Sequence, residues 1–251
     1  MREARAGESR AGGTEPPAGA AGEPTPAPRD SDSPRFSALD FQRRPLPEML
    51  ARAESHAREM ARRRSVRQFS RESVPRELIE NAIRVAGSAP SGAHQQPWSW
   101  VVVTDPDLKA RIREAAEREE QEFYRDRAPR EWLDALAPLG TDFVKTHITD
   151  APCVVVLFRR LHEIDSTGRR RTLYYTQESC GLATGFFITA IHLAGLATLT
   201  HTPSPMGFLR ELLGRPENEK PFLLMPVGYP ADDARVPDLR RRSLEEISVW
   251  L

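Results

Sequence analysis

A run of 22 residues without Asp, Glu, Lys or Arg constrains the fold of this chain more than any other feature. It spans residues 179–200 and reads SCGLATGFFITAIHLAGLATLT. Its length would suit a membrane span, but its repeated glycines and threonines and the central His192 oppose one. Small residues that recur along a helix favour close packing against another helix. We therefore expect a helix in a protein core or at a dimer interface, followed by a strand at 197–201.

The composition limits the classes of function. The chain has 251 residues, enough for one domain and a tail, and its 36 basic residues match 36 acidic ones. A protein that binds nucleic acid or a membrane surface usually has a basic excess, so we expect neither partner. Cys153 and Cys180 lie in apolar stretches, which favours buried free thiols over a disulfide. No CxxC or HExxH spacing occurs, and we expect no metal site.

The N-terminal residues differ from the rest of the chain. Residues 1–34 are rich in Ala, Gly and Pro and contain almost no large apolar side chains. Such a segment buries too little surface to offset the entropy that it loses on ordering. We predict a disordered tail at 1–35 and a folded domain at 36–251. The sequence contains no signal peptide or membrane anchor that we recognise, which predicts a cytoplasmic protein.

The expected strands and helices do not alternate in a regular βαβ rhythm, which indicates an α+β sandwich. Pro47 and Pro75 suit the first turns of two helices. Asp105 followed by Pro106 is an N-cap signal for a helix that runs to about Arg127. That helix has a thin apolar face, so we expect it to be mostly exposed. Three apolar runs predict buried strands, at Trp98–Val103, Ala151–Phe158 and Phe222–Val227.

The strongest indication of a ligand is a cluster of arginines. Arg63, Arg64, Ser65 and Arg67 lie within five residues of one another. Planar guanidinium groups bind phosphate oxygens through paired hydrogen bonds, so this cluster predicts an anion site. A basic helix end would explain Arg63 and Arg64 equally well, but it would not explain Arg67.

A turn of small residues follows, Pro90-Ser91-Gly92-Ala93-His94. Side chains cover its backbone N–H groups only slightly, so a flat ligand can approach them. The turn alone is typical of an ordinary loop. Together with the arginine cluster it predicts a ligand with a phosphate at one end and a flat group at the other, as in flavin mononucleotide (FMN). No GxGxxG or GxxxxGK[ST] motif is present, which argues against dinucleotide and P-loop sites.

A third group of polar residues lies in and beyond the long polar helix. Glu120 and Tyr124 are four residues apart and share one helix face, and Lys145 is the nearest downstream lysine. A carboxylate, a phenol and an ammonium group could together bind an amino-acid zwitterion. A helix rich in Glu always offers some such trio, so a solvated surface is the better interpretation of this pattern alone.

Taken together, these residues resemble the iodotyrosine deiodinase branch of the nitroreductase flavoprotein superfamily. The resemblance is collinear from about Ala61 to the C-terminus. The segments that carry the resemblance are RRSVR (63–67), APSGAHQQPW (89–98), EEQEFY (119–124), Lys145, TLTHTP (198–203), LLGRPENEK (212–220), PVGYP (226–230) and VPDLRRR (236–242). In TLTHTP, His201 stands where the family pattern has a further threonine.

The resemblance implies a nitroreductase-like three-layer sandwich. It also implies an intertwined homodimer that holds FMN at the subunit interface, and a lid at about 105–147. The implied FMN contacts are Arg63, Arg64, Ser65, Arg67, Pro90, Ser91, Gly92, Thr200, His201, Thr202 and Arg241.

The resemblance further implies FMN-dependent reductive dehalogenation of halogenated tyrosines, which converts iodotyrosine to tyrosine and halide. Glu120 would bind the substrate ammonium, and Tyr124 and Lys145 its carboxylate. The implied catalytic groups are the backbone N–H of Ala93, which would bind the substrate phenolate, and the hydroxyl of Thr202, which would tune the flavin. Electrons would come from a reduced nicotinamide cofactor such as NADPH or from a separate reductase.

Three other functions stay open. A broad nitroreductase or quinone reductase would turn over nitroaromatics with little dependence on amino and carboxyl groups. A non-catalytic flavin- or halotyrosine-binding protein would bind both ligands but form no tyrosine. An interaction protein regulated by anions at the arginine clusters would be colourless when purified.

Overall fold

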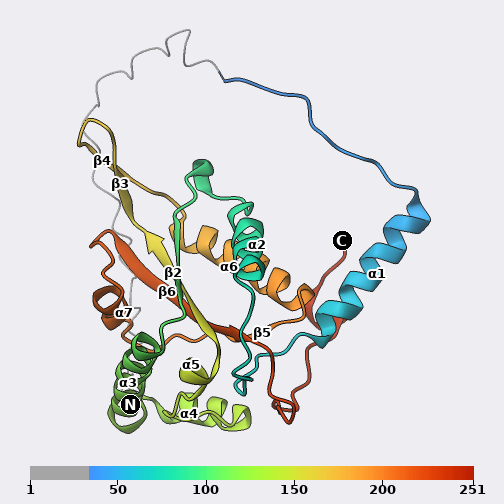
Figure 1. The fold of residues 1–251 in the computed structure, drawn as a ribbon. Helices are drawn as coiled ribbons and strands as arrows, with labels where there is room; N and C mark the ends of the chain where they lie inside the picture. Colours follow the sequence, from blue (N-terminus) through green and yellow to red (C-terminus); the bar gives the residue numbers. More distant parts are fainter. Residues whose placement is uncertain (1–33) are drawn as a thin grey trace, which may run out of the picture. The chain divides into compact units, whose positions relative to one another are not determined.

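The structure, a computed structural model, describes residues 34–251 (Figure 1). The predicted disordered tail, apart from its last two residues, lies outside the described residues. The chain divides into two units, Met1–Pro45 and Leu46–Leu251, and residues 34–45 of the first contain no helix or strand. The second unit carries every element described below. Among the residues that the structure describes, no helix is both long and apolar enough to cross a membrane.

One four-stranded sheet organises the second unit. The strand order is β1-β2-β6-β5, and each neighbouring pair is antiparallel. Ser65 adds a parallel bridge to Thr198 in β5, which places the arginine cluster at this edge of the sheet. The strands are β1 (Trp98–Val103), β2 (Cys153–Arg160), β5 (Ala197–Thr198) and β6 (Glu219–Gly228).

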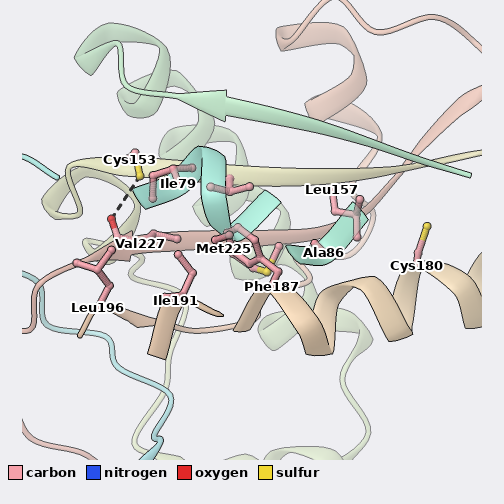
Figure 2. Packing of buried hydrophobic residues seen from close by; sticks show 12 residues of the cluster. Ile79, Ala86, Cys153, Leu157, Cys180, Phe187, Ile191, Leu196, Met225 and Val227 are labelled. Atoms are coloured by element: carbon pink, nitrogen blue, oxygen red, sulfur yellow. Dashed lines mark hydrogen bonds between the residues drawn. The ribbon is translucent and has the colours of Figure 1, made fainter. Parts of the chain in front are cut away.

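The central strand β2 is apolar over six consecutive residues because both of its faces are covered. Successive side chains of a strand point to opposite faces, so its residues divide between two cores. Val155 and Leu157 belong to the core shown in Figure 2, together with Phe187. Val154 and Val156 belong to the core on the opposite face.

Helices cover both faces of the sheet and form the two outer layers. α2 and α6 pack on the first core through residues such as Ile79 and Phe187 (Figure 2). α3, α5 and α7 pack on the second core through Ile112, Ile148 and Leu209. The predicted α+β three-layer sandwich is therefore confirmed. These helices are α2 (Arg76–Gly87), α3 (Pro106–Glu122), α5 (His147–Asp150), α6 (Thr176–Leu193) and α7 (Gly207–Leu212).

The charge-free run forms most of α6 and then β5, as its composition predicts. One face of α6 is buried, but Leu182, Phe186 and Leu193 are exposed. Helix α1 (Leu46–Arg62) has no buried residue. The remaining elements are η2 (Gly92–His94), the π-helical η3 (Phe123–Arg127), α4 (Arg130–Leu136), η4 (Ala137–Leu139), β3 (His162–Ile164), β4 (Arg170–Thr172) and α8 (Leu244–Ile247).

Most local predictions are confirmed, and two are wrong. Helix α3 was expected to be mostly exposed, but fewer than half of its residues are exposed, because its inner face packs on the second core. Strand β1 has its predicted bounds, but it is an edge strand whose Val102 is 41% exposed, so it is not fully buried. Asp105 caps α3, because its side chain accepts a hydrogen bond from the N–H of Leu108 at 2.7 Å. Cys153 and Cys180 are free and buried, and burial raises the pKa of Cys153 to about 11 and that of Cys180 to about 12. Both therefore stay unreactive thiols at neutral pH.

Replacing Gly228 in β6 with Ala should destabilise the protein by about 1–3 kcal/mol. A Cβ at Gly228 would lie 2.5 Å from Cδ and 3.1 Å from Cγ of Pro152, too close for a real contact, so the backbone or the proline ring must shift. Gly87→Ala is the matched control, because nothing lies within 4 Å of a Cβ there. Urea unfolding measures both effects, and a Gly228→Ala variant as stable as the control would contradict this packing.

Candidate active site

A cavity of about 580 Å³ lies between residues 120–141 and the loop that follows β5. Helix α4, which belongs to the first of these segments, has no buried residue, and its Trp132 borders the cavity while staying 55% exposed. A segment with so few packing contacts can open at a small cost in free energy, so a lid here stays a prediction. The cavity wall includes Arg67, Glu120, Tyr124, Lys145, His201 and Thr202.

The predicted trio of Glu120, Tyr124 and Lys145 meets at this cavity. Nζ of Lys145 lies 2.6 Å from Oε2 of Glu120 and 5.9 Å from the ring centroid of Tyr124. The side chains of Lys145 and Glu120 are only 3% and 12% exposed. The interpretation of these residues as solvated surface is therefore wrong. Sequence alone could not show this, because burial of Glu120 depends on how α3 packs.

His201 completes the surroundings of Glu120. Its Nε2–H donates to Oε1 of Glu120 at 2.6 Å, so both carboxylate oxygens have partners. Burial raises the pKa of Glu120, but the hydrogen bonds from His201 and Lys145 outweigh it and leave the pKa below its ordinary value. Glu120 is thus an anion at neutral pH. Burial and the charge of Glu120 raise the pKa of Tyr124, whose hydroxyl stays a hydrogen-bond donor.

Two contacts from α3 hold the segment that carries Lys145. The backbone N–H of Lys145 donates to Oε1 of Glu117 at 2.7 Å. Nζ of Lys109 donates to the carbonyl oxygen of Ala151 at 2.6 Å, just after α5. Helix α3 therefore positions Lys145 as well as Glu120, so the two charges of the pair depend on one element.

His147 also borders the cavity, although nothing in its sequence context singles it out. It is buried, and its Nε2 has no hydrogen-bond partner among the described residues. Burial, with the nearby charges of His201 and Lys145, lowers the pKa of His147 to about 3. The ring is therefore neutral at all but strongly acidic pH. A lone histidine gives no sequence signal for this, since its environment is made by tertiary packing.

We expect His147 to make the protein less stable in acid. Its pKa is about 3 in the folded state, against about 6.5 in an unfolded chain. The unfolded chain therefore binds a proton first, and stability falls as the pH drops from about 6.5 towards 3. Between pH 7 and pH 4 the loss should be about 3 kcal/mol.

Urea unfolding at pH 7 and pH 4 tests this expectation on the His147→Gln variant. The wild-type protein should lose about 3 kcal/mol more than the variant over this range. His56→Gln, at an exposed position of α1, is the control and should behave as the wild-type does. Equal losses in the wild-type and His147→Gln would contradict the neutral buried ring.

The arginine cluster lies beside β5, and the C-terminal tail brings Arg241 to it. Within residues 34–251, no carboxylate forms an ion pair with Arg63, Arg64, Arg67 or Arg241. Burial and the positive charges of Arg241 and Arg64 lower the pKa of Arg63. The guanidinium groups of Arg63, Arg64 and Arg241 are close enough to affect one another, and such a group without a counter-ion suits a phosphate dianion, whereas Arg67 borders the cavity beside Glu120.

Arg241 lies beside the cluster, where its guanidinium makes a structural contact. It donates to the carbonyl oxygens of Ala61, at 2.5 Å, and of Arg63. Arg64 in turn donates to the carbonyl oxygen of Pro237. These contacts fasten the tail to the end of α1, which no local sequence pattern indicated.

The turn of small residues lies away from the arginine cluster and from the trio of Glu120, Tyr124 and Lys145. The N–H of Gly92 donates to Oγ of Ser179 at 3.2 Å, near the start of α6. Ala93 has φ 49°, a left-handed conformation that costs free energy in a residue other than Gly. A Cβ at Gly92 would lie 2.8 Å from the ring of Tyr175, so the turn needs Gly there. None of the residues Pro90–Ala93 borders the cavity.

Helix α6 separates this turn from the arginine cluster (Figure 1). The turn contacts Ser179, whereas Nε2 of His192 contacts the carbonyl oxygen of Glu59 at 3.0 Å, just before the cluster. At 1.5 Å per residue, these two points of α6 are about 20 Å apart. Four cavities of about 350–580 Å³ border the cluster, and residues 90–94 line none of these four.

Known proteins share this fold. A family model described as "Nitroreductase family" matches residues 60–229. The chain belongs to the nitroreductase family. It is 52% identical over 202 residues to the iodotyrosine deiodinase of Haliscomenobacter hydrossis, covering 80% of this chain and 91% of that protein. It is 45% identical over 208 residues to mouse iodotyrosine deiodinase 1, covering 82% and 73%.

These identities place the chain in the iodotyrosine deiodinase-like branch of the nitroreductase family, as its motifs predicted. A crystal structure of an iodotyrosine deiodinase bound to FMN and 3-iodo-L-tyrosine matches it with a TM-score of 0.66 and 29% identity. That match covers 78% of this chain and 100% of the other. A BluB-like flavoprotein from Clostridium difficile 630 shares the fold, with a TM-score of 0.59 and 21% identity over 78% of this chain and 98% of its own.

Proposed function

We propose that this nitroreductase-family protein is an FMN-dependent iodotyrosine deiodinase, an oxidoreductase that converts halogenated tyrosines to tyrosine and halide. One observation carries the proposal: the buried pair of Glu120 and Lys145 lies beside Tyr124 in the wall of a cavity. Its two opposite charges match the ammonium and carboxylate of a free amino acid. The related structure with bound FMN and 3-iodo-L-tyrosine supports the same assignment.

Substrate binding exchanges one buried ion pair for two. Glu120 leaves Lys145 for the substrate ammonium, while Lys145 and Tyr124 bind the substrate carboxylate. The exchange keeps every buried charge paired, which avoids the large cost of an uncompensated one. A phenol without these two charges cannot drive the exchange, so the site selects the zwitterion.

The arginine cluster fits the phosphate of FMN, because it gathers guanidinium groups without any carboxylate partner in the described residues. Bound FMN supplies two electrons which, with one proton, replace the carbon–halogen bond by a carbon–hydrogen bond and release halide. Arg63, Arg64, Ser65 and Arg67 would hold its phosphate and ribityl end. The loop after β5 would place Thr202 at the ring. The electron donor, a reduced nicotinamide such as NADPH or a reductase, and a cytoplasmic location stay predictions.

The active form is a homodimer in which each site combines two subunits. The arginine cluster and lid come from one subunit, and the turn Pro90–His94, including the N–H of Ala93 for the phenolate, comes from the other. Two observations support this: the turn and the cluster contact opposite ends of α6, and α6 leaves Leu182, Phe186 and Leu193 exposed. An apolar helix face of this kind suits a subunit interface.

An anaerobic assay tests the proposed reaction. The purified protein is reduced with dithionite and mixed with 3-iodotyrosine, and tyrosine and iodide are quantified. A yellow protein that forms both in equal amounts supports the proposal. A yellow protein that reduces nitroaromatics but forms no tyrosine would show a broad nitroreductase instead. A colourless protein that FMN does not reconstitute would refute the cofactor assignment. NADPH in place of dithionite then tests the electron donor.

A further inference from the structure

We propose that His201 is a positioning residue that fixes the carboxylate of Glu120 in the orientation needed to bind the substrate ammonium. The inference rests on the proposed function, because that function assigns Glu120 to the amine. It also revises the role of His201, which the sequence resemblance placed at the flavin. In the structure its ring is hydrogen-bonded to Glu120 in the lid.

The backbone of His201 is anchored in the core of the protein. Its N–H donates to the carbonyl oxygen of Leu224 at 2.8 Å, and its own carbonyl oxygen accepts from the N–H of Leu224 at 3.0 Å. Leu224 lies in β6 and is fully buried. The side chain of His201 therefore extends from the sheet and not from a mobile loop.

The hydrogen bond from His201 links this core to the lid. Glu120 lies in the last turn of α3, immediately before the π-helical turn Phe123–Arg127. Its two oxygens have different partners, since Lys145 contacts Oε2 and His201 contacts Oε1, each at 2.6 Å. When Lys145 turns to the substrate carboxylate, His201 is the partner that keeps Glu120 oriented.

The two ring nitrogens of His201 have different surroundings. Nε2 lies 2.6 Å from Oε1 of Glu120, whereas Nδ1 is buried and has no partner among the described residues. The charged groups that face the ring are Glu120 and Lys145, with Arg67 in the same cavity wall. The ring of His147 is 5.3 Å away and neutral, because burial lowers its pKa to about 3.

A donor on one oxygen suits a positioning role. The hydrogen bond from Nε2 of His201 to Oε1 fixes the orientation of the carboxylate, and Oε2, which now contacts Lys145, is the oxygen that the substrate ammonium can take over. Lys145 is the cation that must leave, and the substrate carboxylate gives it a new partner.

The test compares two substitutions in the FMN-loaded protein. His201→Leu removes the donor, and His201→Gln keeps an amide N–H of similar reach. Titrations with 3-iodotyrosine and with 2-iodophenol, which lacks the amino and carboxyl groups, follow flavin fluorescence. His201→Leu should weaken 3-iodotyrosine binding about tenfold or more and leave 2-iodophenol binding unchanged. His201→Gln should restore most of the affinity, and both variants should keep their FMN.

Several results would overturn the inference. These are an equal loss of affinity for both ligands, a failure of His201→Gln to restore binding, or a loss of FMN from His201→Leu. If the wild-type protein binds no 3-iodotyrosine, the proposed function fails, and nitrogen NMR of the histidine rings still tests the contact. A proton on Nε2 whose signal shifts in Glu120→Gln supports it, and a ring protonated on Nδ1 alone refutes it.

Discussion

Two inactive variants of this protein should regain activity when they are mixed. The first is a double variant that carries both Arg63→Ala and Arg67→Ala, so its arginine cluster is defective. Each lost charge-assisted hydrogen bond costs about 1.5–3 kcal/mol, so the two substitutions together should weaken FMN binding by about 10² to 10⁴-fold. The second, Gly92→Val, has a defective turn, because a Cβ at Gly92 would lie 2.8 Å from the ring of Tyr175.

The gain in activity follows from the composition of the proposed sites. In a mixed dimer, one site receives both defects and the other receives none. If subunits exchange at random, about half of the dimers are mixed, and the mixture should reach about a quarter of wild-type activity. A mixed dimer purified through two different tags should bind one FMN, as its flavin absorbance will show.

A second mixture is the control for this experiment. This mixture combines the single variant Arg63→Ala with the single variant Arg67→Ala. Both defects lie in the arginine cluster, so each site of the mixed dimer contains one of them and stays defective. The arginine and turn variants must therefore complement each other, while the two arginine variants must not. If the arginine and turn variants gave no activity, although a mixed dimer formed, each site would have to lie within one subunit.

Lys145→Met should abolish detectable binding of 3-iodotyrosine and also destabilise the fold. The substitution removes the partner of a buried carboxylate, which costs about 3–5 kcal/mol of stability. It also removes the cation that would bind the substrate carboxylate. Glu120→Gln should likewise abolish binding of the ammonium, but it should destabilise less, since an amide keeps acceptor and donor groups in the same place. Urea unfolding and flavin fluorescence measure the two effects.

The double variant separates stability from recognition. Glu120→Gln combined with Lys145→Met removes both charges, so no unpaired buried charge remains. Its stability should therefore exceed that of Lys145→Met, whereas its affinity for 3-iodotyrosine should stay undetectable. Binding of 2-iodophenol serves as the control and should change little in all three variants. Unchanged 3-iodotyrosine affinity in Lys145→Met would contradict the assignment of this residue to the substrate.

The sequence predicts the layers of this fold well, because they depend on local patterns. The charge-free run forms α6, the β-branched run after Pro152 forms β2, and Asp105 caps α3 as expected. The burial of β1 was overestimated, since its WSWVVV sequence does not show whether a strand lies at the edge or the centre of a sheet. Position in a sheet is a property of the whole topology.

The candidate site was predictable only in part. The arginine cluster and the trio of Glu120, Tyr124 and Lys145 could be named from motifs, but the pairing of Glu120 with His201 joins residues 81 positions apart. The neutral state of His147 likewise follows from packing and not from its neighbours in sequence. The distance between the turn and the arginine cluster depends on α6, because the two motifs contact opposite ends of that helix although they are close in sequence.

The sparse packing of α4 has a consequence for how affinity can change in this protein. A helix without buried residues is held mainly by its own backbone and by whatever it covers, so ordering it draws on the free energy of ligand binding. A residue of higher helix propensity at an exposed position such as Asp134 would lower that cost by a fraction of a kcal/mol. Selection can therefore adjust the working substrate concentration through residues that never touch the substrate, while the chemistry stays the same.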